Sequence, residues 1–251
     1  MDIKFLDKNK DEYKIVLFGD SISRGVIYDE QLKKYRILTN NYVAILNEYL
    51  KAGVDNTARF GNTIIRALKK INKIIDKNTH DIALIEFGGN DCDFNWDEIA
   101  QNPLIDHRPK TEFADFEERL ISLVTYIKKS DMFPVLFTIP PIDSDRYFNW
   151  VSNNDIDKQK NILKFLGTVS KIHWWQERYN SLILTVGEKT HTPILDIRSA
   201  FLRQEDYRKY ICLDGIHPNE LGHKIIAETI YDFIQTKYSF LLHKKFIKTL
   251  L

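Results

Sequence analysis

Short runs of consecutive apolar residues alternate along this chain with longer segments whose apolar residues recur every three or four positions. A continuous apolar run is typical of a strand buried on both faces, and the wider spacing is typical of an amphipathic helix. The expected strands are residues 14–18, 57–60, 81–87, 134–139 and 193–197. The expected helices are residues 42–50, 63–75, 116–127, 174–186 and 221–238.

This alternation predicts an α/β protein with a doubly wound, mostly parallel sheet between two layers of helices. No linker or shift in composition divides the chain, so we expect a single domain over residues 1–251 with its core at about 14–235. Residues 91–112 and 142–158 show neither pattern and are expected to be loops. Both follow the carboxyl end of an expected strand, where open α/β sheets bind ligands, so they are expected to wall a substrate pocket.

The last part of the chain, residues 236–251, is expected to be a helical tail. Leu242, Phe246 and Leu250 follow one another at four-residue spacing, with lysines between them. This pattern favours a helix that packs back on the domain. A homodimer contact and a helix lying on a membrane surface are the alternatives.

Charge and cysteine content exclude several classes of protein. Lys and Arg number 36 against 35 Asp and Glu, so the chain lacks the basic excess typical of nucleic-acid binding. Cys92 and Cys212 are too few for a disulfide framework and suit a reducing compartment. Residues 1–8 carry charges where a signal peptide has an apolar run, and no apolar stretch reaches the roughly 20 residues of a spanning helix. We therefore expect a cytoplasmic protein without nucleic-acid partners or stable membrane insertion.

Candidate chemistry begins directly after the first expected strand, at Gly19-Asp20-Ser21. Gly19 permits a tight turn, which would present Ser21 at the carboxyl edge of the sheet. A helix N-cap is the alternative interpretation, because Ser and Asp oxygens accept hydrogen bonds from the first N–H groups of a helix. The G-x-S-x-G elbow of the α/β-hydrolases is absent, since the residue two after Ser21 is Ser23.

An acid–base pair stands before the last expected helix, where Asp214 precedes His217 by three positions. His217 would take the proton of Ser21, and Asp214 would orient the imidazole and stabilise its charged form. The alternative is a polar turn in which Asn219 caps the helix. A metal site is disfavoured because His217 and His223 have no third His or Cys at ligand spacing.

Two further positions follow the second and third expected strands: Gly61, and Asn90 within Gly88-Gly89-Asn90-Asp91. A backbone N–H and a side-chain amide are suitable donors for the oxyanion that forms in acyl transfer. Taken singly, each is an ordinary turn former. Because the loops after parallel strands open on one edge, these donors are expected to lie close to Ser21.

In this order and spacing, Gly19-Asp20-Ser21, Gly61, Gly88-Gly89-Asn90-Asp91 and Asp214-x-x-His217 resemble the four motif blocks of the SGNH (GDSL-type) hydrolase family. The resemblance implies a flavodoxin-like α/β/α sandwich with a five-stranded sheet. It also implies a catalytic Ser21, His217 and Asp214, and an oxyanion hole made by Ser21, Gly61 and Asn90. Two positions depart from the pattern: Ile22 replaces the usual Leu, and Arg59 stands where an Asn precedes the Gly.

The resemblance implies hydrolysis of an acyl ester through an acyl-enzyme, without a metal or cofactor. We expect a small polar substrate with a short acyl group, such as an O-acetylated carbohydrate. The alternatives are a lysophospholipase, a thioesterase, an acyltransferase and a non-catalytic binding module. The candidate substrate-binding residues are Asp20, Trp96, Arg146 and Trp150, although aromatic and Arg side chains in the two loops would equally pack those loops down.

Overall fold

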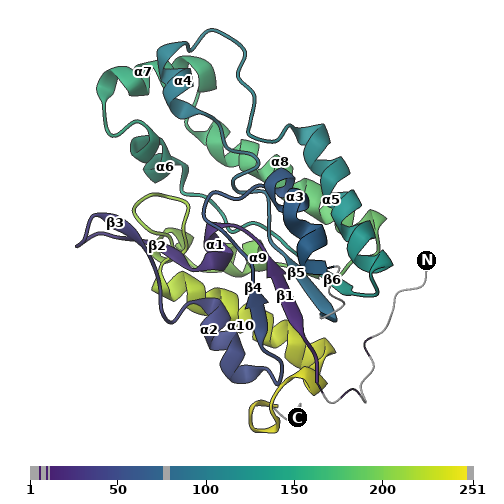
Figure 1. Ribbon diagram of the computed structural model, residues 1–251. Coiled ribbons are helices and arrows are strands. Elements are labelled where there is room, and N and C mark those ends of the chain that lie inside the picture. The colour runs from purple at the N-terminus through teal and green to yellow at the C-terminus, as the bar shows by residue number, and fades with distance from the viewer. Residues whose placement is uncertain (1–5, 7–9, 11, 76–79, 248–251) are drawn as a thin grey trace.

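A computed structural model describes residues 6, 10, 12–75 and 80–247 of the chain. Within these residues, five parallel strands form the central sheet (Figure 1). From one edge to the other the strands are β4 (Val54–Asn56), β1 (Ile15–Phe18), β5 (Ile82–Ile85), β6 (Phe133–Phe137) and β7 (Ile194–Leu195). This is the flavodoxin-like strand order, so the direction of winding reverses between β1 and β5.

Helices cover both faces of the sheet because its central strands are buried on both sides. Leu17, Leu84 and Val135 belong to the apolar cluster on one face, and Val16 and Ile85 belong to the cluster on the other. The first face carries α2 (Tyr42–Tyr49), α9 (Ile197–Leu202) and α10 (Glu220–Lys237). The second face carries α3 (Ile64–Ile75), α5 (Phe113–Lys129) and α8 (Ser170–Lys189). The predicted three-layer α/β/α fold is therefore confirmed.

Two strands differ from their predicted positions. The second strand spans Val54–Asn56 rather than residues 57–60. It lies at the sheet edge, pairs only with β1, and has one apolar residue, so no apolar run marks it in the sequence. The last strand is only two residues long, because Asp196 already caps α9 by accepting a hydrogen bond from the Ser199 N–H at 3.1 Å.

The two segments expected to be loops contain helices. They hold α4 (Trp96–Gln101), α6 (Ser144–Val151) and the start of α7 (Ile156–Leu166). These three helices pack into an apolar cluster of their own beyond the carboxyl edge of the sheet, and we call them the cap (Figure 1). A short antiparallel hairpin, β2 (Val26–Asp29) and β3 (Lys34–Ile37), was also not predicted and follows the four-residue helix α1 (Ser21–Arg24).

The C-terminal segment is not the expected helix. After α10, the described residues up to 247 form two 3₁₀ turns, Ser239–Leu241 and Lys244–Phe246. Another 3₁₀ turn, Tyr207–Tyr210, lies before α10. Leu242 is fully buried and pairs with Leu50 in an isolated antiparallel bridge, which ties the segment to α2. Leu250 lies outside the described residues. Over the part of the chain that is described, no helix is long and apolar enough to cross a membrane.

Candidate active site

Ser21 stands at the point where the sheet reverses its winding. It is the first residue of α1, directly after β1, and the neighbouring strand β5 leads to Asn90. Asp20 is the N-cap of α1, since its carboxylate accepts a hydrogen bond from the Ile22 N–H at 2.9 Å. The capping interpretation therefore applies to Asp20, and it leaves the Ser21 hydroxyl available for chemistry.

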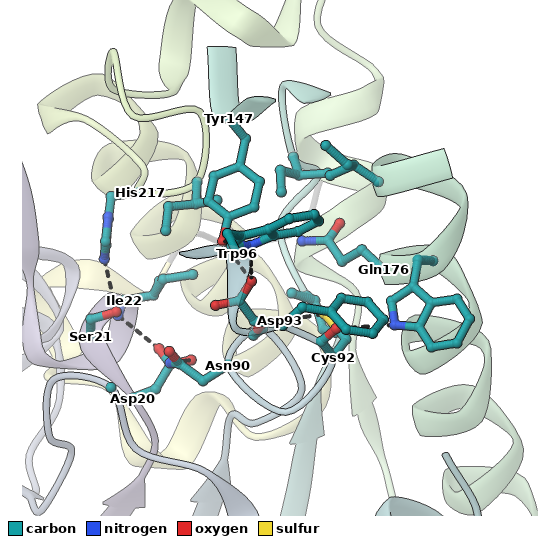
Figure 2. A pocket seen from close by; sticks show the side chains of 18 of the residues that line it. Asp20, Ser21, Ile22, Asn90, Cys92, Asp93, Trp96, Tyr147, Gln176 and His217 are labelled. Atoms are coloured by element: carbon teal, nitrogen blue, oxygen red, sulfur yellow. Dashed lines mark hydrogen bonds between the residues drawn. The ribbon is translucent and has the colours of Figure 1, made fainter. Parts of the chain in front are cut away.

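Ser21, His217 and Asp214 form a continuous hydrogen-bond chain, and Figure 2 shows its bond between Ser21 and His217. Ser21 Oγ lies 2.8 Å from His217 Nε2, and His217 Nδ1 lies 2.5 Å from Asp214 Oδ2. An ionised carboxylate only accepts hydrogen bonds, so Nδ1 carries the hydrogen and Nε2 accepts from the serine hydroxyl. All three side chains are buried. This geometry fits a serine nucleophile with its general base and the group that orients the base.

The loop that carries Asp214 and His217 is held at both of its ends. Ile211 and Pro218 form an antiparallel bridge, and the Cys212 N–H donates to the His217 carbonyl at 2.8 Å. Burial alone would raise the pKa of Asp214, but the hydrogen bond and charge of His217, with two backbone N–H groups, outweigh it and hold that pKa below its ordinary value. Asp214 is therefore kept ionised beside the imidazole.

Asn90 and Gly61 line the same cavity as Ser21. Asn90 Nδ2 donates to Asp20 Oδ2 at 2.9 Å, and the second N–H of the amide remains for another acceptor. Asp91 anchors this loop, since its carboxylate accepts hydrogen bonds from the backbone N–H groups of Ile64 and Gly88. Gly61 has φ of +65°, a conformation that side chains with Cβ rarely adopt.

A buried acid lies beneath α1 and was not singled out in the sequence. Glu86 Oε2 accepts from the Ser23 hydroxyl at 2.9 Å and from the Asp20 N–H at 3.3 Å, and Ser23 accepts from the Tyr42 hydroxyl at 2.7 Å. Burial, and then the charge of Asp20, raises the pKa of Glu86 well above its ordinary value. The available signal was a charged residue directly after the apolar run of a central strand.

The cavity beside Ser21 has a volume of about 300 Å³ and lies between the sheet edge and the cap. Of the four candidate substrate-binding residues, Asp20 and Trp96 line it, whereas Arg146 and Trp150 do not. Arg146 donates to the backbone carbonyls of residues 208 and 211 and pairs with Asp143, which supports the loop before Asp214.

Trp150 contacts a different part of the site. Its ring packs edge-on against Tyr28 and Tyr35 of the hairpin, and Tyr35 in turn contacts the His217 ring at a centroid distance of 5.4 Å. Trp150 therefore supports the aromatic residues beside the base. Among the described residues, no group of three or more His, Cys, Asp or Glu side chains is arranged to hold a metal ion.

Comparison with known proteins places this arrangement in a family. Residues 17–225 match the model of the GDSL-like Lipase/Acylhydrolase family. The GDSL esterase/lipase CPRD49 of Arabidopsis thaliana is 24% identical over 225 residues, which cover 86% of this chain and 77% of that protein. The lipase/acylhydrolase from Enterococcus faecalis has a TM-score of 0.64 at 20% identity, over 95% of this chain and 100% of that chain. Axe2, an acetylxylan esterase from Geobacillus stearothermophilus, has a TM-score of 0.60 at 19% identity, over 95% and 97% of the two chains. The chain therefore belongs to the GDSL-like lipase/acylhydrolase family and is a carboxylic-ester hydrolase.

Proposed function

We propose that this protein hydrolyses its ester through an acyl-enzyme formed on Ser21. The observation that carries the proposal is the hydrogen-bond chain from Ser21 Oγ through His217 to Asp214, which opens on the cavity. A serine hydroxyl is a weak nucleophile until a neighbouring base removes its proton. Nε2 of His217 lies within hydrogen-bond distance of that proton before any substrate binds.

In the first half of the reaction, Ser21 Oγ attacks the ester carbonyl carbon while His217 Nε2 takes the hydroxyl proton. The electron pair of the C=O bond moves to the carbonyl oxygen, which becomes an oxyanion. The tetrahedral intermediate then collapses, the bond to the alcohol oxygen breaks, and His217 returns the proton to the leaving alcohol. In the second half, water attacks the acyl carbon while His217 Nε2 takes a proton from it. The bond from the acyl carbon to Ser21 Oγ then breaks, His217 returns the proton to Oγ, and the acid product leaves.

The proposed oxyanion hole consists of the Ser21 and Gly61 N–H groups and the Asn90 amide. Its support is that all three residues line one cavity and that Asp20 holds the Asn90 amide from behind. Donors fixed in advance stabilise the oxyanion most, because they do not reorganise during the reaction. Loss of one such donor typically lowers kcat by about 10²–10³.

The test combines turnover with covalent labelling of the serine. We expect the protein to hydrolyse p-nitrophenyl esters and to react with a fluorophosphonate, with the adduct mapped to Ser21 and not to Ser23, its buried neighbour on α1. Ser21→Ala should abolish both turnover and labelling. A protein that neither turns over esters nor takes the label would be a binding module. Transfer of the acyl group to an added alcohol in preference to water would make it an acyltransferase.

A further inference from the structure

The position of the base decides on which side of Ser21 each half of the ester lies. His217 must protonate the leaving alcohol oxygen, so the alcohol leaves on the His217 side. Tyr35 and Phe60 flank His217 there, and Phe60 is 58% exposed, so this side is open to solvent. The acyl group must then extend the other way, past Asn90 and under the cap. In Figure 2, Ser21 lies below His217 at the left, and Trp96, Asp93 and Gln176 lie to the right of both.

Beyond Asn90 the cavity is walled mainly by apolar side chains of the cap and of α8. The lining residues at this end are Phe94, Trp96, Phe165, Leu166, Ile172 and Trp175. All six belong to the apolar cluster of the cap or pack against it. An apolar substrate group that enters here would exchange water for aromatic and aliphatic contacts.

Two acceptors in this part of the wall, the Asp93 carboxylate and the Gln176 side-chain oxygen, already have donors. Asp93 Oδ1 accepts from the Trp96 indole N–H at 2.8 Å and from the Tyr147 hydroxyl at 2.6 Å, and Asp93 Oδ2 pairs with Lys110 at 2.7 Å. The Gln176 side-chain oxygen accepts from Arg198 at 3.0 Å. The Asp93 carboxylate and the Gln176 oxygen therefore hold the wall in place and need no hydrogen-bond donor from the substrate.

The thiol of Cys92 also lines the cavity without competing with Ser21. It donates to the Gly89 carbonyl at 3.3 Å, and burial raises its pKa well above the ordinary value. The thiol therefore stays protonated and is a poor nucleophile.

The volume of the cavity sets the size of the group that it holds. A cavity of roughly 150 Å³ holds benzene, so about 300 Å³, which includes the part beside Tyr35, Phe60 and His217, offers room for about twelve non-hydrogen atoms of the whole ester. An acetyl group would fill only about a quarter of that space. The far end is bounded by polar side chains, since Asp106, His107 and Lys171 also line the cavity and Lys171 lies over the Phe165 ring at 5.2 Å. A chain that reached beyond this point would meet charged groups and water.

We propose that the pocket under the cap binds an apolar acyl group of about six to eight carbons, larger than the acetyl group expected from the sequence. This inference rests on the proposed acyl-enzyme on Ser21. It assigns Ile172 and Leu166, which line the pocket and follow Lys171 and Phe165 in the chain, as the residues that limit acyl length.

The test is a series of p-nitrophenyl esters from acetate to dodecanoate, in which only the acyl group changes. We expect kcat/KM to rise by roughly fourfold for each added methylene as far as about eight carbons, and to fall at dodecanoate. Ile172→Trp, which narrows the pocket, should lower the ratio of octanoate to acetate kcat/KM by roughly tenfold or more. Leu184→Trp makes the same kind of change at an exposed position on the same helix and should leave the ratio unaltered.

A profile that peaks at acetate, or an octanoate-to-acetate ratio that Ile172→Trp leaves unchanged, would overturn the inference. A second series consists of acetates of increasingly large alcohols. If kcat/KM rises as steeply in this series as in the acyl series, the inference is also overturned. Fluorophosphonate labelling of Ser21 is measured on the same protein. A labelled and active enzyme with a short acyl preference would reject only the acyl pocket, whereas loss of labelling and turnover together would reject the proposed mechanism.

Discussion

Asp20→Asn is the substitution that separates the two tasks of Asp20. One carboxylate oxygen caps α1 through the Ile22 N–H, and the other accepts the Asn90 amide, each at 2.9 Å. Asn is as good an N-cap as Asp, so its oxygen can keep the cap. Its NH₂ group then replaces the oxygen that faces Asn90, and two donors meet where a donor and an acceptor met before.

The expected loss follows from the hydrogen bond that is removed. A hydrogen bond to a charged group contributes about 1.5–3 kcal/mol, which corresponds to a roughly 10- to 150-fold lower kcat if all of it is lost in the transition state. Asn90→Ala, which removes the oxyanion donor itself, should lower kcat by about 10²–10³. If Asp20 acts by holding Asn90, the double variant should be no slower than Asn90→Ala alone.

The assay is a double-mutant cycle of kcat on one p-nitrophenyl ester, with the thermal unfolding of each variant measured alongside. An unchanged unfolding temperature for Asp20→Asn would show that the cap of α1 is intact. The reasoning is refuted if the two substitutions multiply in the double variant, since Asp20 would then act on catalysis independently of Asn90.

Three further predictions concern stability and the support of the site. Burial holds the pKa of His223 to about 3, below its ordinary 6.5, so the unfolded chain gains a proton between these pH values that the folded state does not. The free energy of unfolding of His223→Phe should therefore rise by about 3 kcal/mol relative to that of the wild type as pH falls from 6.5 to 4, measured by urea unfolding. Free energies of unfolding that change in parallel with pH in the two proteins would contradict this. Burial and the charge of Asp20 raise the pKa of Glu86 well above 4.5. The folded state therefore keeps a proton that the unfolded chain releases, and the protein loses stability as pH rises above 4.5. Glu86→Gln should weaken that decline in unfolding titrations from pH 5 to 8, and an unaltered slope would show that Glu86 is not its source. Arg146→Ala should slow fluorophosphonate labelling of Ser21 several-fold by freeing the carbonyls of residues 208 and 211, whereas a labelling rate equal to that of the wild type would exclude this role.

The alternation of apolar runs and helical periodicity was sufficient to predict the layers of the fold, because the central strands are apolar along their whole length. It failed where a short element depends on contacts made elsewhere. The edge strand Val54–Asn56 has two polar residues and is defined by its pairing with β1. The cap helix Ser144–Val151 begins with polar residues after the capping Asp143, and it is buried through Tyr147 and Phe148 against distant parts of the chain.

The candidate site divides in the same way. Ser21 and Asn90 could be placed from the sequence because each follows a strand of a parallel sheet, and such strands end at one edge. Arg146 and Trp150 could not be placed from the sequence. Arg146 supports the loop before Asp214 and Trp150 supports Tyr35, and their sequence neighbours indicate neither contact. Their residue types suggested substrate binding, whereas their packing is with the protein itself. The catalytic roles of Ser21, His217 and Asp214 stay a prediction until the serine is labelled.

Two buried groups that lower stability, Glu86 and His223, are linked by contacts of Tyr42 and Ser23 to α1, the helix that carries Ser21. Within the described residues, Glu86 Oε1 and both ring nitrogens of His223 are buried without a hydrogen-bond partner. Tyr42 connects the two residues, since its ring stacks on His223 and its hydroxyl donates to Ser23, which in turn donates to Glu86. Ser23 lies on α1, two residues after Ser21, so the same contacts that are costly to bury also fix the position of the nucleophile. An apolar side chain in place of Glu86 should therefore raise stability and lower kcat together, because it would relieve the burial of the acid but would no longer hold α1 by hydrogen bonds.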